Sequence, residues 1–355
     1  MSGSAGKSST TKLIVAILRE HGLSVFTNES TANIEQGLAS SMIRQSDLSG
    51  KLPTDVWVLE LDEAHAARLG PKIAPDLGVL TNLMTDQLDR FDDPEEVLAK
   101  LVELAAQCKT VALNSNDPHL RNLKHDRIVR FSASSELLAS DDAPELAPYF
   151  GGLPALPDSP ELLVHRPAPG ELTLTVANKT FALRPKLRGT HNAFNIAAAW
   201  LAAATFLQEQ SEFSRFSVAI ESAEPVFARD ELVTIRSRSV RLMLVQNPGS
   251  FRLNLRRLGV PKVPVMIAIG SDVHDPSWIW SIDFSQFEQV QLVSGVNAHQ
   301  LALWLRYQGI EVMAVVPDVA AAADAFLEGL PGGEGTVILT ADAMRRFRRH
   351  LGLAK

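Results

Sequence analysis

Residues 3–8 read Gly-Ser-Ala-Gly-Lys-Ser, a glycine-rich turn that ends in a lysine and a hydroxyl residue. This is the pattern of a phosphate-binding loop, in which backbone N–H groups surround phosphate oxygens, Lys7 reaches the β- and γ-phosphates and Ser8 sits on Mg²⁺. Residues 9–18 continue with apolar side chains at helical spacing, so the loop opens a helix whose N-terminus favours anions. The nucleotide-binding residues predicted here are Gly3, Gly6, Lys7, Ser8 and Ser9, with Ser8 also a predicted metal ligand.

The start of the chain allows another interpretation, because glycine- and serine-rich starts also occur in disordered leaders. Only Met1 and Ser2 stand before the loop, which leaves no room for the strand that leads into such loops. We therefore expect an N-terminally truncated domain.

Composition limits the class of protein. The 355 residues suffice for two domains, and no apolar run approaches the roughly 20 residues of a membrane helix. A single cysteine, Cys108, excludes an internal disulfide framework and a cysteine-based zinc site within one chain. The formal net charge of −7 argues against a general nucleic-acid binder. We expect a cytoplasmic protein, since no signal peptide is visible.

Strand and helix patterns alternate along the chain, which predicts an α/β fold with parallel, doubly wound sheets. The predicted strands of the first part are residues 56–61, 77–81 and 110–114, and the predicted helices include 94–108 and 192–208. Residues 171–183 indicate a hairpin, whereas the proline-rich residues 143–170 indicate a loop or insertion. We place a domain boundary near residue 224. A second α/β pattern follows, with strands within 232–245 and at 265–270, 291–294 and 335–340, and a helix at 298–308.

Ligands of such folds bind at the carboxyl ends of parallel strands. Glu60, Asp62 and Glu63 follow the first predicted strand, and carboxylate oxygens suit Mg²⁺. We favour Glu60 as a ligand of Mg²⁺ or of a water molecule, although the same residues also fit a solvated acidic turn. The polar residues 81–90 and the Asx-rich turn 114–118 follow the next two strands.

Five segments together resemble the central ATPase domain of the Mur ligases. They are the phosphate loop, Glu60-Leu-Asp-Glu63, Asn82-x-x-x-Asp86-Gln-Leu-Asp-Arg90, Leu113-Asn-x-x-Asp-Pro118 and Gly189-Thr-His-Asn-Ala-Phe-Asn195. Two further segments resemble the MurT-type branch, the ligase subunits of lipid II isoglutaminyl synthases: Gln246-Asn-Pro-Gly249 and Asp275-Pro-Ser-Trp-Ile-Trp280. The resemblance covers nearly the whole chain. It implies a P-loop-type ATPase domain over residues 1–224 and a smaller Rossmann-like, MurT-type domain over residues 225–355.

The resemblance also implies a reaction in peptidoglycan biosynthesis. Such enzymes use ATP and Mg²⁺ to phosphorylate the α-carboxylate of D-glutamate in the stem peptide of lipid II, at the membrane surface. Ammonia then attacks the acyl phosphate and gives D-isoglutamine. The ammonia comes from a partner glutamine amidotransferase of the GatD type, in a heterodimer.

The resemblance assigns roles to particular residues. Lys7 and Glu60 serve ATP chemistry, and Asp275 completes the Cys-His pair of the partner, although the bare sequence favours an N-cap or turn for Asp275. The remaining nucleotide-binding residues implied are Asn82, His191, Asn192, Arg229 and Asn247. Four of these five have a structural alternative: a helix cap for His191 and Asn192, a Gly/Pro turn for Asn247 and a surface salt bridge for Arg229. Trp278 and Trp280 are expected to pack or to anchor an interface.

The sequence departs from the family pattern at several positions. Ala5 replaces the usual asparagine of the loop, and the four-cysteine zinc ribbon of the central domain is absent, so no zinc is expected. Two alternatives therefore stay open: a divergent, catalytically impaired MurT-like protein that binds its partner, or another Mur-type amino-acid ligase.

Overall fold

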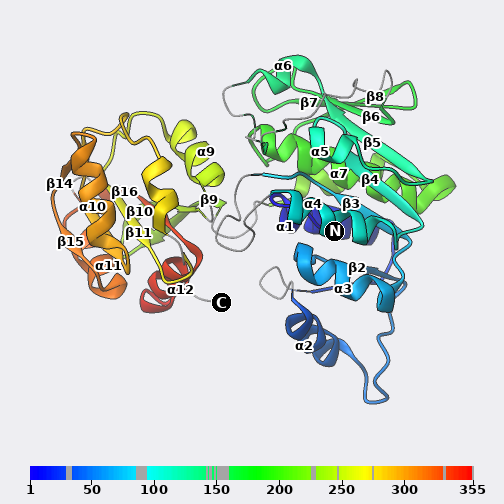
Figure 1. The fold of residues 1–355 in the computed structure, drawn as a ribbon, viewed down its shortest axis with the longest axis horizontal. Coiled ribbons are helices and arrows are strands. Elements are labelled where there is room, and N and C mark those ends of the chain that lie inside the picture. Colours follow the sequence, from blue (N-terminus) through cyan, green and yellow to red (C-terminus); the bar gives the residue numbers. More distant parts are fainter. Residues whose placement is uncertain are drawn as a thin grey trace. The chain divides into compact units, whose positions relative to one another are not determined.

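The computed structural model describes residues 1–28, 34–84, 94–140, 143, 146–147, 149, 160–224, 229–245, 248–273, 276–330 and 333–353. The predictions for Asn247 and Asp275 fall outside these residues, as does the segment 85–90. The chain divides into two compact units, Met1–Glu224 and Pro225–Lys355 (Figure 1). None of the helices in the described ranges is long and apolar enough to cross a membrane.

The first unit is built on a six-stranded sheet with the order β3-β4-β5-β6-β7-β8. β3 to β6 pair in parallel, whereas β6, β7 and β8 pair antiparallel. The strands are β1 (Val25–Thr27), β2 (Val56–Val58), β3 (Leu77–Leu80), β4 (Thr110–Asn114), β5 (Ile128–Ala133), β6 (Leu162–His165), β7 (Leu172–Val176) and β8 (Lys179–Leu183). The helices are α1 (Lys7–Glu20), α2 (Glu35–Gln45), α3 (Glu63–Ile73), α4 (Pro94–Ala105), α5 (Pro118–Arg121), α6 (Ser135–Leu138), α7 (Thr190–Leu207), η1 (Gln208–Gln210) and α8 (Phe213–Ser222).

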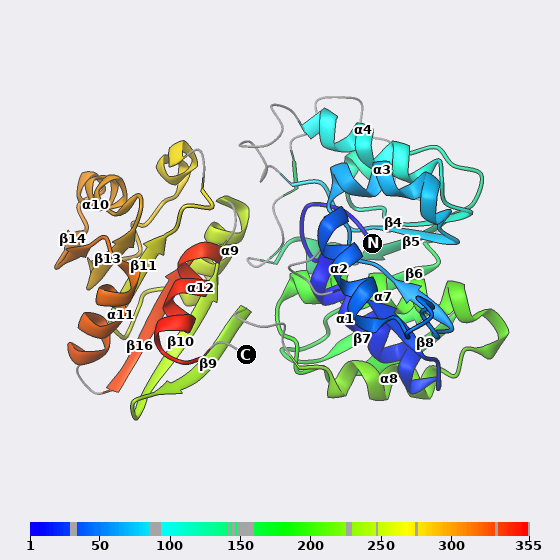
Figure 2. The ribbon, with the colours of Figure 1, turned by 90° about the horizontal axis from the view of Figure 1, so that it is seen from below.

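Helices cover both faces of this sheet. Figure 2 shows α1, α7 and α8 on one face and α3 and α4 on the other. Two apolar clusters correspond to these two layers. One joins α1, α7 and α8 to the sheet around Trp200, and the other joins α3 and α4 to it around Leu101. A parallel sheet covered on both faces explains why β4 is buried along its whole length and why its central residues, Val111, Ala112 and Leu113, are apolar and fully buried.

The backbone of Met1 and Ser2 joins the strands on either side of the phosphate loop. The Met1 amine donates to the Leu59 carbonyl and the Leu61 N–H donates to Met1, while Ser2 forms a parallel bridge to Leu80. β1 and β2 form a parallel pair of their own. An apolar cavity of about 360 Å³ lies between β2 and β3, with Met1 and Cys108 among its lining residues. Burial lowers the pKa of the Met1 amine and raises the pKa of the Cys108 thiol.

The second unit contains a six-stranded sheet with the order β15-β13-β11-β16-β10-β9, parallel except for the β9–β10 hairpin. One face carries α9, η2 and α10 and the other carries α11 and α12. The strands are β9 (Arg229–Ile235), β10 (Arg238–Leu244), β11 (Val265–Ile269), β12 (Gln289–Val290), β13 (Leu292–Gly295), β14 (Glu311–Val312), β15 (Val315–Val316) and β16 (Glu334–Leu339), and β12 pairs with β14. The helices are α9 (Pro248–Leu258), η2 (Pro276–Ser281), α10 (Ala298–Tyr307), α11 (Val319–Glu328) and α12 (Ala341–His350).

The predicted α/β fold with mostly parallel sheets is confirmed, and so is the hairpin formed by β7 and β8. Two local predictions are wrong. Residues 143–170 are not loop throughout, because Leu162–His165 form β6, which pairs with β5 and β7. The strand predicted at 56–61 ends at Val58, because the backbone of Glu60 bonds the side chain of Asn28 instead of a neighbouring strand, and Asp62 is already the N-cap of α3.

Candidate nucleotide-binding site

The phosphate loop turns through two glycines in the left-handed region. Gly3 has φ of 126° and Gly6 has φ of 83°, conformations that side chains disfavour. Both glycines also lie against neighbours: a Cβ would come within 2.3 Å of Thr81 Oγ1 at Gly3 and 2.2 Å of Asn195 Oδ1 at Gly6. Gly6 is the N-cap of α1 and supplies no side-chain cap. The N-terminus of α1 therefore begins with backbone N–H groups that suit an anion.

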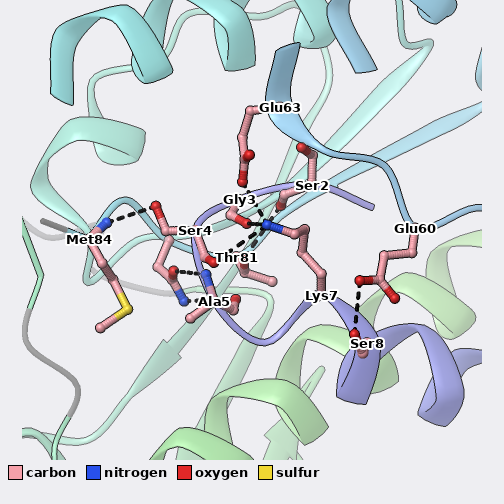
Figure 3. Close-up of polar contacts among 11 residues, drawn as sticks. Ser2, Gly3, Ser4, Ala5, Lys7, Ser8, Glu60, Glu63, Thr81 and Met84 are labelled. Atoms are coloured by element: carbon pink, nitrogen blue, oxygen red, sulfur yellow. Dashed lines mark hydrogen bonds and ion pairs between the residues drawn. The ribbon is translucent and has the colours of Figure 1, made fainter. Parts of the chain in front are cut away.

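Asn82 braces the loop from the segment that follows β3. Its Oδ1 accepts from the Ala5 N–H at 2.9 Å, and its Nδ2 donates to the Ala5 carbonyl at 3.2 Å. Two more bonds join the segments. The Ser4 N–H donates to the Asn82 carbonyl, and the Met84 N–H donates to Ser4 Oγ (Figure 3). The side chain predicted to bind nucleotide thus holds the shape of the loop.

Asp117 anchors this bracing segment in turn. The carboxylate accepts from the Leu83 N–H at 2.6 Å, and it caps α5 by accepting from the N–H groups of His119 and Leu120. Asp117 is fully buried, and burial raises its pKa against the opposing effect of these three N–H donors. The Asx-rich turn after β4 therefore supports the phosphate loop through Leu83 and Asn82.

Ser8 and Glu60 bring two oxygen ligands together. Ser8 Oγ donates to Glu60 Oε1 at 2.8 Å, and Glu60 is buried (Figure 3). The Glu60 backbone is fixed by Asn28, whose side chain accepts from its N–H and donates to its carbonyl. Mg²⁺ commonly takes one or two protein oxygens and completes its shell with water and phosphate, so this pair fits a magnesium ion. Across the described residues, no group of three or more His, Cys, Asp and Glu side chains could hold a metal by itself.

Lys7 lies between the loop and Glu63, the first residue of α3. Its Nζ contacts Glu63 Oε1 at 2.8 Å, the Gly3 carbonyl at 2.6 Å and the Ser4 carbonyl at 3.4 Å (Figure 3). The Glu63 side chain is fully buried and the Lys7 side chain is 12% exposed. The sequence placed Glu63 in an acidic turn but gave it no role, because its partner is 56 positions away.

The N-terminus of α7 lies beside the loop through a residue that the sequence analysis did not select. Asn195 Oδ1 packs on Gly6 and accepts from Thr10 Oγ1 at 3.4 Å, and its Nδ2 donates to Asn192 Oδ1. Asn192 Nδ2 donates to the Arg188 carbonyl and so fixes the approach to the helix, but the N-cap of α7 is Gly189 and forms no side-chain cap hydrogen bond, so the helix-cap alternative for Asn192 is not borne out. His191 occupies the first turn of the same helix. Ser9 is buried in the first turn of α1.

The structure describes only some of the predicted site residues of the second unit. Arg229 opens β9 and pairs in register with Met243, but its side chain is not among the described parts. Trp278 is buried against Phe251, as packing predicts, and Trp280 is 38% exposed and stacks edge-on against Trp304.

Comparison with known proteins identifies both parts of the chain. Residues 1–203 match the profile of the Mur ligase middle domain, and residues 244–344 match that of the MurT ligase C-terminal domain. A curated relative from Streptococcus pneumoniae, the lipid II isoglutaminyl synthase (glutamine-hydrolyzing) subunit MurT, is 26% identical over 87% of this chain and 76% of its own length. The Staphylococcus aureus protein of the same name is 26% identical over 89% of this chain and 78% of its own length.

Solved structures share the fold. A pseudomurein peptide ligase type C from Methanothermus fervidus superposes with a TM-score of 0.74 at 16% identity, over 100% of this chain and 78% of its own. MurF ligase from Thermotoga maritima, solved in complex with ADP, gives 0.66 at 17% identity over 99% of this chain and 78% of its own. The chain belongs to the Mur ligase family and combines a Mur ligase middle domain with a MurT-type C-terminal domain.

Proposed function

We propose that this protein is the ATP-dependent ligase subunit of a lipid II isoglutaminyl synthase, which amidates the α-carboxylate of D-glutamate in the lipid II stem peptide. The convergence of Lys7, Ser8 and Glu60 on the phosphate loop carries the proposal, in a chain whose residues 244–344 match the MurT C-terminal domain. The names of the S. pneumoniae and S. aureus relatives support the substrate, and the ADP bound to T. maritima MurF supports the nucleotide.

The first step is a phosphoryl transfer. A carboxylate oxygen of D-glutamate attacks the γ-phosphorus of ATP, the bond to the β-γ bridging oxygen breaks, and ADP leaves. The product is an acyl phosphate, whose phosphate is a far better leaving group than hydroxide. Catalysis of this step consists of positioning and charge neutralisation.

The residues of the first unit supply both. The N-terminus of α1 and the Lys7 ammonium neutralise phosphate oxygens, and the bracing by Asn82 fixes the loop in advance. Ser8 and Glu60 would hold Mg²⁺, which when bound neutralises charge on the transferred phosphate.

In the second step, ammonia attacks the acyl carbon, inorganic phosphate leaves and the nitrogen loses one proton, giving the amide. We propose that the ammonia comes from a GatD-type glutamine amidotransferase in a heterodimer with this chain, and that Asp275 orients the histidine of that partner's Cys-His pair. In this division of labour residues 1–224 bind ATP and Mg²⁺ and residues 225–355 serve the partner. The expected compartment is the cytoplasm, with lipid II presented at the membrane surface.

The decisive experiment is co-expression with a GatD-type partner, followed by mass spectrometry of lipid II incubated with ATP, Mg²⁺ and glutamine. The expected product carries the small mass decrease of an acid converted to an amide. A stable complex that produces no such product would contradict the proposal and favour the catalytically impaired, partner-binding alternative.

A variant at Asp275 separates the two half-reactions. Asp275→Asn is expected to suppress glutamine hydrolysis in the complex, because the partner's histidine loses its orienting carboxylate. Amidation with added ammonium should stay close to that of the unmodified complex. Equal loss of both activities would remove Asp275 from the proposed triad.

A further inference from the structure

The buried ion pair between Lys7 and Glu63 has a consequence for nucleotide binding. Glu63 begins α3 directly after the strand-end segment that carries Glu60, and Lys7 begins α1, so two helix starts place opposite charges 2.8 Å apart. The Glu63 side chain is fully buried, which leaves the carboxylate little water to screen it. Glu63 is thus a fixed negative charge next to the cation that the proposed function assigns to phosphate.

Lys7 is held on two sides. An ammonium group has three N–H donors, and here it contacts the Gly3 carbonyl, the Ser4 carbonyl and Glu63 Oε1. The two loop carbonyls orient the side chain, whereas the carboxylate also neutralises its charge. A terminal phosphate that approaches Lys7 therefore meets a lysine that already has an anionic partner.

We infer that Glu63 is a positioning residue that aims Lys7 and competes with the terminal phosphates of the nucleotide for its charge. Glu63 weakens the binding of ATP in the ground state and holds the Lys7 ammonium where the transferred phosphate needs it. This inference rests on the proposed binding of ATP at the loop, but not on the identity of the amidated substrate. Glu60 has a different part, since it bonds Ser8.

The test uses Glu63→Gln, which keeps the size of the side chain and one acceptor oxygen for Lys7 and removes the negative charge. We expect the dissociation constant of a nonhydrolysable ATP analogue to fall roughly tenfold, the scale of one charge-assisted interaction. The affinity for ADP should rise less and that for AMP should not change, because AMP carries no β- or γ-phosphate. In steady-state assays of the complex, KM for ATP should fall because ATP binds more tightly. The kcat should also fall, because the Lys7 ammonium is no longer held in position for the transferred phosphate.

Two controls separate this role from a structural one. Glu96→Gln removes an exposed carboxylate from the first turn of α4, which is far from Lys7 in sequence. Like Glu63→Gln, it removes one negative charge at the start of a helix. The affinities for the ATP analogue, ADP and AMP should all stay unchanged. Glu63→Gln added to Lys7→Ala should leave the remaining triphosphate affinity unchanged, because the effect passes through Lys7. Thermal unfolding of each variant establishes that the protein under test is folded.

The outcomes are distinct. Unchanged or weaker triphosphate affinity in a folded Glu63→Gln protein overturns the inference, as does an equal gain for AMP. A gain that persists in the Lys7→Ala background also overturns it. If the unmodified chain binds no nucleotide, both this inference and the ATP-dependent function fail; if it binds ATP but amidates no lipid II, only the proposed substrate fails.

Discussion

The two units use the carboxyl ends of their parallel strands differently. In the first unit the strand ends carry buried charge: Lys7 against Glu63, and Glu60 against Ser8. In the second unit a hydroxyl group joins the ends of β11 and β16, and the ion pair beside it is accessible and lies within α12. Thr340 Oγ1 accepts from the Gly270 N–H at 2.7 Å and donates to Asp272 at 2.8 Å, while Asp342 pairs with the exposed Arg346 at 3.0 Å.

The difference lies in burial. The Arg346 side chain is 55% exposed, whereas that of Lys7 is 12% exposed and that of Glu63 is fully buried. Exposed pairs are worth about 0–1 kcal/mol, but removing one partner of a buried pair costs about 3–5 kcal/mol. Removing Lys7 or Glu63 is therefore expected to cost far more than removing Arg346, although a largely buried pair of Arg348 and Glu231 lies elsewhere in the second unit.

The largest effect is expected from Lys7→Ala. ATP-dependent amidation should fall by at least about a hundredfold, the scale of losing one group that stabilises developing charge. Binding of the partner should persist, because the loop belongs to the first unit. The assay is amidation of lipid II by the purified complex, with partner binding measured in parallel.

The same variant leaves Glu63 buried without its lysine, so lost activity needs a stability control. Lys7→Ala combined with Glu63→Gln should recover most of the stability and none of the activity. Full activity in either variant would remove the phosphate loop from the mechanism.

Asp117→Ala tests how far the brace of the loop extends. Three backbone N–H groups, of Leu83, His119 and Leu120, would lose their acceptor inside the protein. We expect a loss of about 3 kcal/mol in the free energy of unfolding, since buried unsatisfied groups each cost about 1–3 kcal/mol and some will find water. Denaturant unfolding measures it. A loss below about 0.5 kcal/mol, the level of an ordinary surface change, would show that the turn is not a support.

The local sequence pattern predicted those elements whose own side chains have a distinctive composition. β4 has an apolar centre, α7 is alanine-rich, and the glycines of the phosphate loop predict its turn. The missed strand β6 is only four residues long and follows a proline-rich stretch, so its alternation is too short to separate from a loop. Its place in the sheet is set by pairing with β5 and β7, which no local window contains.

The candidate site divides along the same line. The phosphate-loop motif predicted the roles of Lys7 and Ser8, and the position after a predicted strand pointed to Glu60. Glu63 and Asn195 stand in segments that resemble the family, but their roles could not be predicted, because these arise from contacts across 56 and 185 positions of the chain. Asn82 was selected for the ligand, and the structure shows its amide bonded to Ala5, a use that depends on the turn of the loop.

A smaller effect concerns pH. Burial raises the folded-state pKa of Asp117 above its ordinary value of 3.8, so the folded protein takes up this proton more readily than the unfolded chain. The stability linked to this group is fully present below the unfolded pKa and is lost as the pH rises through the folded pKa. Compared with Asp117→Asn, the unmodified protein should therefore lose stability as the pH rises from about 4, the ordinary aspartate value. Urea unfolding of both proteins across this range measures the difference in their free energies of unfolding. If the unmodified protein instead gained stability relative to Asp117→Asn as the pH rises, the raised pKa would be contradicted.

The smallest effect is expected from Asp342→Ala in the second unit. Its carboxylate accepts from Ser271 Oγ at 2.9 Å and pairs with Arg346, so the substitution breaks an interaction similar in kind to that of Lys7 and Glu63. Because solvent reaches both Ser271 and Arg346, each can bond water instead, and the loss should stay near about 1 kcal/mol or less. Denaturant unfolding at low and high salt is the measurement, since only a screened surface pair loses its contribution in salt. A loss of stability that does not depend on salt and is as large as that of Asp117→Ala would mean that Asp342 behaves as a member of a buried ion pair. The contrast between the strand ends of the two units would then fail.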